Sequence, residues 1–278
     1  MSLSTLRASL VILAAGLLAH AQADSALAGP FPDKNLETAI RGVLKHEPNV
    51  ELTDEKLLNV YVLEAVGKEI KDLTGLEKCK NLALIRLSKN QVVDLKPLKD
   101  LQNLQSLDLA DNKVVDLAPL AQLKNLQYLE LSNNQVVDIA PLSGLSSLSA
   151  LYLNGNQIVD IAPVGGLAKL ASLCLGKNQV KDIGPLAKVT KLSMLELQDN
   201  QIEDISPLAK QTEVRTLILE RNKISDLTPL VNSVKEDAAG QKRFAPYLRL
   251  FLSGNPLSDD AKSSQLNACK EAGVRVES

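Results

Sequence analysis

The stretch NNQVVDIAPLSGL, residues 133–145, returns with small changes along most of the chain. Close copies are DNKVVDLAPLAQL at 111–123, GNQIVDIAPVGGL at 155–167 and KNQVKDIGPLAKV at 177–189. The asparagine at the second position of this phrase recurs every 22 residues, at Asn90, Asn112, Asn134, Asn156, Asn178, Asn200 and Asn222. A fixed interval of this length is typical of repeat proteins, in which each repeat packs against its neighbours in the sequence.

Apolar residues stand eight, five and three positions before each of these asparagines, which gives the pattern L-x-x-L-x-L-x-x-N. The alternation in L-x-L predicts a short strand. Because a three-residue strand cannot bury its own leucines, we expect the repeats to stack into one parallel sheet over a continuous core. The asparagine follows the strand, and we expect its side chain to be buried and to bond to backbone groups of adjacent turns.

An aspartate stands four positions after each asparagine, and a proline usually stands at the seventh position. This pair predicts a short 3₁₀ turn, in which the carboxylate accepts free amide protons and the proline fixes φ. The same acids would stack as a ladder, which leaves divalent-cation binding as an alternative role. We favour the cap and expect no metal site, because cation sites usually draw several oxygen ligands from one or two loops. The acids are Asp72, Asp94, Asp116, Asp138, Asp160, Asp182, Asp204 and Asp226.

The pattern is that of the leucine-rich repeat, and its 22-residue form with D-L-x-P-L resembles the internalin family of bacterial exported proteins. Three segments look like the helical cap and first degenerate repeat of that family: FPDKNLETAIRGVLK at 31–45, LTDEKLLNVYVLEA at 52–65 and IKDLTGLEKCKNL at 70–82. The resemblance implies an exported bacterial interaction module. We therefore expect an α/β fold, a leucine-rich-repeat solenoid with a parallel β-sheet on its concave face, short 3₁₀ turns on its convex face and a helical N-terminal cap.

These sequence patterns divide the chain into four parts: an export signal peptide at residues 1–23, a linker and helical N-terminal cap at 24–66, leucine-rich repeats at 67–255 and a C-terminal cap at 256–278. The signal peptide is indicated by Arg7, by the short apolar run at 10–18 and by the small-x-small cleavage patterns that follow. In the cap, Asp33 and Thr53 stand where two helices should begin.

The repeat interval breaks once, because Asn222 and Asn255 lie 33 residues apart, which is one repeat plus 11 extra residues. The extra residues lie near 232–243, in a charged stretch that we expect to form a loop or a helical extension. This insertion is either a tolerated surface segment or a contact with a partner.

Without the signal peptide the chain carries 30 basic and 33 acidic side chains, a net charge near −3. A protein with no basic excess is a poor partner for nucleic acid or for an anionic membrane surface. No apolar stretch is long enough to span a bilayer. We expect an exported monomer, periplasmic or secreted, with no membrane insertion.

Three cysteines are spread along the repeats. Coils that stack about 4.8 Å apart place Cys79, Cys174 and Cys269 tens of ångströms from one another, and a disulfide needs Cα atoms within about 7 Å. We therefore expect no intramolecular disulfide. Cys79 occupies a core position, whereas Cys174 falls on the exposed face of the sheet and should be an accessible thiol.

In each repeat the residues four and six positions before the asparagine alternate away from the core, onto the concave face. Tyr128 and Tyr152 fall there on neighbouring coils, and they are either the anchor of a protein-binding site or an exposed cross-strand pair. Met194, Ile218 and Phe251 form a second apolar area, which is either a contact site or is covered by the insertion. The candidate partner-binding residues are Arg86, Asp108, Tyr128, Glu130, Tyr152, Met194, Glu196, Ile218 and Phe251.

A stripe of β-branched residues also recurs three positions after the asparagine, at Val93, Val115, Val137 and Val159. It is either a second interface or a consequence of strand-like backbone preference.

The sequence gives little support to catalysis. His46 is the one histidine outside the signal peptide, so no histidine cluster can bind zinc, and no phosphate-binding or protease motif occurs. We expect no cofactor and no enzymatic activity, and we interpret the protein as a module that binds a protein through the concave face. The alternatives are an enzyme with its site on the cap or the insertion, and a structural spacer in the cell envelope.

Overall fold

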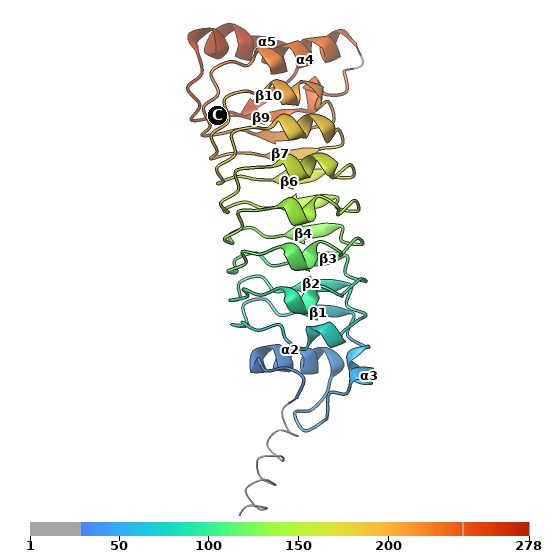
Figure 1. Cartoon of the computed structure of the whole chain (residues 1–278). Coiled ribbons are helices and arrows are strands. Elements are labelled where there is room, and N and C mark those ends of the chain that lie inside the picture. The colour runs from blue at the N-terminus through green and yellow to red at the C-terminus, as the bar shows by residue number, and fades with distance from the viewer. Residues whose placement is uncertain (1–28, 241, 278) are drawn as a thin grey trace, which may run out of the picture.

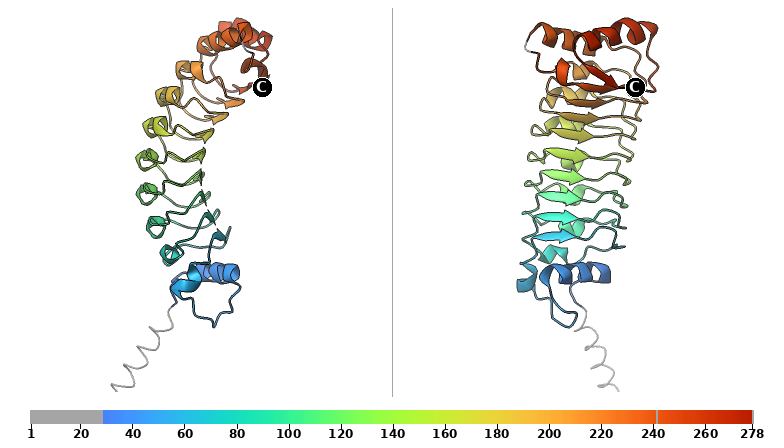
Figure 2. Two further views of the ribbon diagram at one scale, coloured as in Figure 1. Left: turned by 90° about the vertical axis from the view of Figure 1, so that its right-hand side faces the viewer. Right: turned by 180° about the vertical axis from the view of Figure 1, so that it is seen from behind.

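A computed structural model describes residues 29–240 and 242–277, and the predicted signal peptide lies outside these residues. The described chain winds into a curved stack of coils (Figure 1). One strand of each coil lies on the inner side of the curve, and one short helix lies on the outer side (Figure 2). The predicted solenoid, with a concave parallel sheet and convex 3₁₀ turns, is confirmed.

Ten three-residue strands of the described chain form one parallel sheet, in the order of the sequence. Along the first eight strands each residue pairs with the residue 22 positions later, as Leu129 does with Leu151. The spacing changes at the insertion, where Leu217 pairs with Leu250, and at the last pair of strands, where Leu250 pairs with Val276. The strands are β1 Val62–Glu64, β2 Leu84–Arg86, β3 Ser106–Asp108, β4 Tyr128–Glu130, β5 Ala150–Tyr152, β6 Ser172–Cys174, β7 Met194–Glu196, β8 Thr216–Ile218, β9 Arg249–Phe251 and β10 Arg275–Glu277.

The leucines of the repeat pattern form one continuous core under this sheet. Leu104, Leu107 and Leu109 of one coil are fully buried, and so are Leu126, Leu129 and Leu131 of the next. Complete burial of such a side chain contributes about 1.5–3 kcal/mol. Since a single coil has no partner for its leucines, the stability of every coil depends on its two neighbours.

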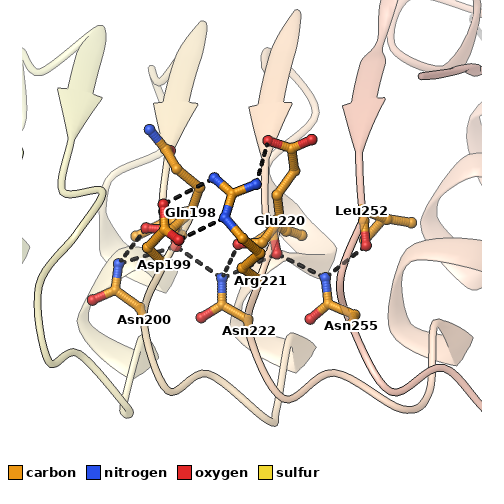
Figure 3. A network of polar contacts seen from close by, with 10 residues as sticks. Gln198, Asp199, Asn200, Glu220, Arg221, Asn222, Leu252 and Asn255 are labelled. Atoms are coloured by element: carbon orange, nitrogen blue, oxygen red, sulfur yellow. Dashed lines mark hydrogen bonds and ion pairs between the residues drawn. The ribbon is translucent and has the colours of Figure 1, made fainter. Parts of the chain in front are cut away.

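The asparagines form a buried ladder just beyond the ends of the strands (Figure 3). The Nδ2 of Asn222 donates to the carbonyl oxygens of Leu197 at 2.9 Å and Leu219 at 3.0 Å. Its Oδ1 accepts from the amide of Ile202 at 3.0 Å. One amide side chain thus satisfies backbone groups of its own coil and of the coil before it. The same three bonds recur at the other asparagines of the pattern, so the predicted role is confirmed.

The aspartates begin the convex turns, as predicted. The Oδ1 of Asp116 accepts from the amide of Ala118 at 2.8 Å, and Pro119 follows in the same turn. The described residues contain no group of three or more histidine, cysteine or carboxylate side chains that could hold a metal ion. The 3₁₀ helices are η1 Leu76–Lys78, η2 Lys96–Leu98, η3 Ala118–Leu120, η4 Ala140–Leu142, η5 Ala162–Gly166, η6 Gly184–Lys188, η7 Ser206–Lys210 and η8 Ala245–Tyr247.

Two helices, α2 Lys34–Leu44 and α3 Asp54–Leu57, cover the first end of the core. Asp33 begins α2: its Oδ1 accepts from the amides of Asn35 at 2.9 Å and Leu36 at 3.1 Å. Its Oδ2 accepts from the amides of Lys71 at 2.8 Å and Asp72 at 3.2 Å. One carboxylate therefore caps the helix and also fastens it to the first coil.

Replacing Asp33 with alanine should lower the free energy of unfolding by about 1–2 kcal/mol. Burial raises the pKa of the Asp33 carboxyl, but its backbone hydrogen bonds outweigh burial and hold that pKa below its ordinary value. The stabilisation is therefore present above the unfolded-state pKa near 4, and it is lost as the pH falls through the lower folded-state pKa. Urea unfolding at pH 7 and pH 3 measures the difference, and it should shrink at pH 3. Asp100→Ala is the matched exposed control, and an equal loss there would contradict the assignment.

The insertion extends the turn of its coil into α4 Thr228–Ala239. This helix packs beside η7 on the convex side, and then against η8 and the C-terminal helix α5 Leu266–Glu271. It does not lie over Met194, Ile218 or Phe251, so the alternative in which the insertion covers these residues is wrong. The reason is that α4 continues a convex turn and so grows on the face opposite the strands. The π-helical turn η9 Ala261–Gln265, α5 and β10 complete the far end.

Candidate functional site

The concave face is built from the first and third residue of each strand, because the middle residue points into the core. Leu129 and Leu151 are fully buried, while the residues on either side of each in β4 and β5 are partly exposed. The strands repeat, but the outward residues do not. The face thus presents a different pair of side chains on each coil of a rigid scaffold, and all nine candidate partner-binding residues lie on it.

An aromatic pair lies at the middle of this face. The ring centroids of Tyr128 and Tyr152 are 5.4 Å apart and the rings are tilted by 45°. Burial raises the pKa of Tyr128 to about 12, and the nearby charges of Glu130 and Asp108 add to the shift. The phenol is therefore neutral at physiological pH, and the pair offers both apolar ring area and hydrogen-bonding hydroxyl groups.

Two carboxylates lie next to the aromatic pair. Asp108 and Glu130 are register partners on β3 and β4, and Glu130 is in turn paired with Tyr152 on β5. Burial raises the pKa of the Glu130 carboxyl, the bonds from Ser132 lower it, and the charges of Asp108 and Asp111 raise it again, with a net upward shift. On the adjacent coil Arg86 is already paired, with its Nη1 2.8 Å from Glu64.

Cys174 does not present the accessible thiol that the sequence predicts, since only 2% of its surface is exposed. Its coil carries small outward residues, so longer side chains of the neighbouring coils reach over it. Asn154 Nδ2 donates to Glu196 Oε2 at 3.4 Å across this coil, and Asn154 Oδ1 accepts from the amide of Gly176 at 2.6 Å. Burial raises the pKa of the Cys174 thiol, and the Glu196 carboxylate raises it further. The thiol is therefore both covered and protonated.

We expect a thiol reagent such as dithiobis(nitrobenzoate) to leave the native protein unmodified, with less than about 0.1 equivalent reacted in an hour. All three cysteines are buried and unpaired in the described chain, and burial raises the pKa of Cys79 to about 12 and that of Cys269 to about 11. After denaturation in guanidinium chloride, the three thiols counted in the sequence should react. Rapid reaction of one equivalent in the folded state would show that the cover over Cys174 is absent.

A second apolar area lies toward the C-terminal end of the concave face. Met194 and Ile218 lie half-buried on the neighbouring strands β7 and β8, and Phe251 follows on β9. The guanidinium of Arg249 lies 5.3 Å from the centre of the Phe251 ring. A cation above an aromatic face is a stable arrangement in itself. The positive charge of Arg249 is therefore already stabilised by Phe251 within the protein.

Comparison with known proteins identifies the repeats. The family model "Leucine Rich repeats (2 copies)" matches residues 80–122, 102–145, 124–169, 168–210 and 190–232. The crystal structure of internalin C2 from Listeria monocytogenes is 37% identical to this chain, covers 73% of it and 91% of its own chain, and has a TM-score of 0.71. This protein belongs to the internalin-like leucine-rich repeat family. The predicted resemblance is thereby confirmed.

Other leucine-rich repeat structures share the fold of this internalin-like protein. A leucine-rich repeat protein of Leptospira interrogans is 24% identical, with a TM-score of 0.71, and the match covers 82% of this chain and 57% of that one. The ectodomain of the plant receptor kinase GASSHO1/SCHENGEN3 from Arabidopsis thaliana, in complex with Casparian strip integrity factor 2, is 25% identical. Its TM-score is 0.56, and the match covers 65% of this chain and 22% of that one. No curated protein sequence matches this chain.

Some residues of the concave surface were missed by the sequence interpretation of this internalin-like protein. Asn154 and Gln198 stand two positions before the ladder asparagine, beyond the end of each strand. Asp199 and Arg221 stand one position before it, and the Arg221 Nε lies 2.6 Å from Asp199 Oδ1 (Figure 3). The alternation of outward and inward residues continues past the end of each strand. This alternation could have predicted that Asn154 and Gln198 lie on the concave surface.

The valine stripe is exposed, as its polar neighbours suggest. Val93, Val115, Val137 and Val159 are each about half exposed, at 49–54%, on the flank beside the capping aspartates.

His46 lies just after α2 and lines a shallow open cavity with Arg41, Lys45 and Thr38. No hydrogen bond within the described chain involves its imidazole ring, so the geometry around it supplies no nucleophile and base in contact. In the described part of the chain, no helix has the length and apolar character that crossing a membrane requires.

Proposed function

We propose that this internalin-like protein is an exported, non-catalytic binding module that recognises a protein partner through the concave face of its sheet. The observation that carries the proposal is the half-exposed Tyr128–Tyr152 pair, at 5.4 Å, beside the carboxylates of Asp108 and Glu130, which form no ion pair in the described chain. Tyrosine is enriched at the centres of protein interfaces, because it combines a large rigid contact area with a hydroxyl group.

The scaffold supports the same conclusion. The leucines, asparagines and aspartates that the fold needs are the repeating residues, and the residues that differ from coil to coil are the outward ones. Variation on a fixed scaffold is the arrangement by which repeat proteins achieve specificity. Leucine-rich repeat proteins are typically protein-binding modules, and the plant receptor ectodomain with the same fold is in complex with another molecule.

Export rests on the signal-peptide pattern at residues 1–23, with a periplasmic or secreted destination. We expect the mature protein to act as a monomer. We also propose the domain boundaries given above. The binding surface further includes the remaining candidate residues, Arg86, Met194, Ile218 and Phe251.

The Tyr128→Ala/Tyr152→Ala double variant should capture the partner from envelope or host extracts at least about tenfold less efficiently than the wild type. The variant removes the ring area of both anchors, and it leaves the core positions unchanged. The matched control is Val115→Ala/Val137→Ala, which deletes two exposed apolar side chains on the flank. Melting curves establish that both variants are folded. Equal capture by the wild type and the tyrosine variant would contradict the proposal.

A further inference from the structure

The centre of the concave face holds negative charge that the protein itself does not neutralise. None of the ion pairs among the described residues involves Asp108, Glu130 or Glu196. At the N-terminal side Arg86 is the register partner of Asp108, but its Nη1 forms an ion pair with Glu64 at 2.8 Å. At the C-terminal side Asp199 and Glu220 form ion pairs with Arg221. The unneutralised carboxylates are thus confined to the part of the face that carries the aromatic pair.

The arrangement of Asp108 and Glu130 is unfavourable in the free protein. Register partners on adjacent strands lie about 4.8 Å apart, and like charges placed directly opposite destabilise a sheet. Each acid accepts one backbone hydrogen bond, Asp108 Oδ1 from the amide of Ala110 at 3.0 Å and Glu130 Oε1 from the amide of Ser132 at 2.7 Å. The fold does not require a charged group there, since β6 carries Ser172 and Cys174 at the same two outward positions. A charge that weakens the free protein and is not needed by the scaffold is explained by what it binds.

The rings and the carboxylates favour the same kind of ligand group. An aromatic face attracts a cation, and a carboxylate beside it neutralises the charge. The guanidinium group of arginine fits both, because it is planar, stacks on aromatic rings and binds a carboxylate through two parallel hydrogen bonds. The same charges repel phosphate groups, so the face is unsuited to nucleic acid and to anionic lipid.

We propose that the protein partner is a basic segment that inserts an arginine side chain beside Glu130 and the Tyr128–Tyr152 pair. This inference rests on the proposed function. Asp108 and Glu196 lie on β3 and β7, four strand spacings apart, which is about 19 Å. An extended segment of about six residues spans that distance, so these two carboxylates receive further basic side chains of the same segment.

The test uses the full chain and two synthetic probes, a fluorescent peptide of alternating glycine and arginine and the same peptide with citrulline at every arginine. Citrulline keeps the planar shape and removes the charge. By fluorescence anisotropy the arginine peptide should bind at least about tenfold more tightly than the citrulline peptide. Glu130→Gln should weaken its binding at least about fivefold.

Glu203→Gln is the control, because it removes the same charge from the flank, where the Glu203 side chain is 54% exposed. It should change binding less than about twofold. Glu130→Gln should melt no lower than the wild type, since the amide oxygen of glutamine can still accept from the amide of Ser132 and the loss of charge relieves a repulsion. Equal binding of the two peptides, or an equal loss in the two variants, would overturn the inference. If the peptide test fails but capture of the partner still depends on Tyr128 and Tyr152, only this inference is wrong. If capture is unaffected by replacing both tyrosines, the proposal that the partner binds the concave face is wrong as well.

Discussion

Replacing Asn134 with alanine is expected to lower the free energy of unfolding by about 3–5 kcal/mol. Its Nδ2 donates to the carbonyls of Leu109 at 2.9 Å and Leu131 at 3.0 Å, and its Oδ1 accepts from the amide of Val114 at 2.9 Å. The substitution leaves these backbone groups buried without partners, and each orphaned group costs about 1–3 kcal/mol. Because Asn134 joins two coils near the middle of the array, the loss falls on the contact between the two halves of the solenoid.

Urea unfolding followed by circular dichroism measures this loss, and a broadened or biphasic transition is also expected, since repeat arrays uncouple at a weakened contact. Asn125→Ala is the matched control. Asn125 is exposed and donates one bond, at 2.8 Å, to the carbonyl of Gln102, so its removal should cost less than about 1 kcal/mol. Similar costs for the two substitutions would show that the buried ladder does not hold the coils together.

Replacing Phe31 with alanine should also cost about 3–5 kcal/mol. Phe31 is fully buried at the N-terminal end of the core. It fits there because residue 75 is a glycine with φ of 102°, where an added Cβ would lie 2.6 Å from the ring. The truncation leaves a cavity between the helical cap and the first coil. Since terminal repeats need a cap, the N-terminal coils should then unfold before the rest.

The comparison for this prediction is Phe251→Ala, which makes the same truncation on the half-buried concave face. There it should cost no more than about 1 kcal/mol, because the removed ring is replaced by water rather than by a cavity. Hydrogen exchange resolves the position of the effect. Early exchange confined to residues 31–90 in Phe31→Ala is expected, and uniform exchange along the solenoid would contradict a capping role.

The architecture could be predicted because every coil solves the same problem. Each coil must bury its leucines, satisfy its backbone groups and cap its turn. The residues that do this recur in the sequence every 22 positions. Once the strand positions are known, the parallel register places Tyr128 and Tyr152 diagonally from each other on adjacent strands, so the sequence also predicted that these residues are neighbours. The tilt and separation of the two rings depend on side-chain packing, which a repeat pattern does not determine.

What the sequence could not predict depends on contacts between distant parts of the chain. Cys174 is covered by a bond between Asn154 and Glu196, which lie 42 residues apart on the two coils that flank it. The pattern assigns each outward position to the surface and has no information on the reach of neighbouring side chains. Similarly, the charge of the insertion indicated a surface segment, but its convex position follows from α4 continuing the turn that begins at Thr228.

The central claim is that the partner contacts the concave sheet, and site-specific photo-cross-linking tests it most directly. The photoreactive residue p-benzoylphenylalanine would replace Tyr152 on the concave face in one variant and Val137 on the flank in another, and both would be illuminated in the extract that contains the partner. The account predicts one recurrent protein adduct, identified by mass spectrometry, from position 152 and none from position 137. An adduct formed from position 137 alone would contradict it.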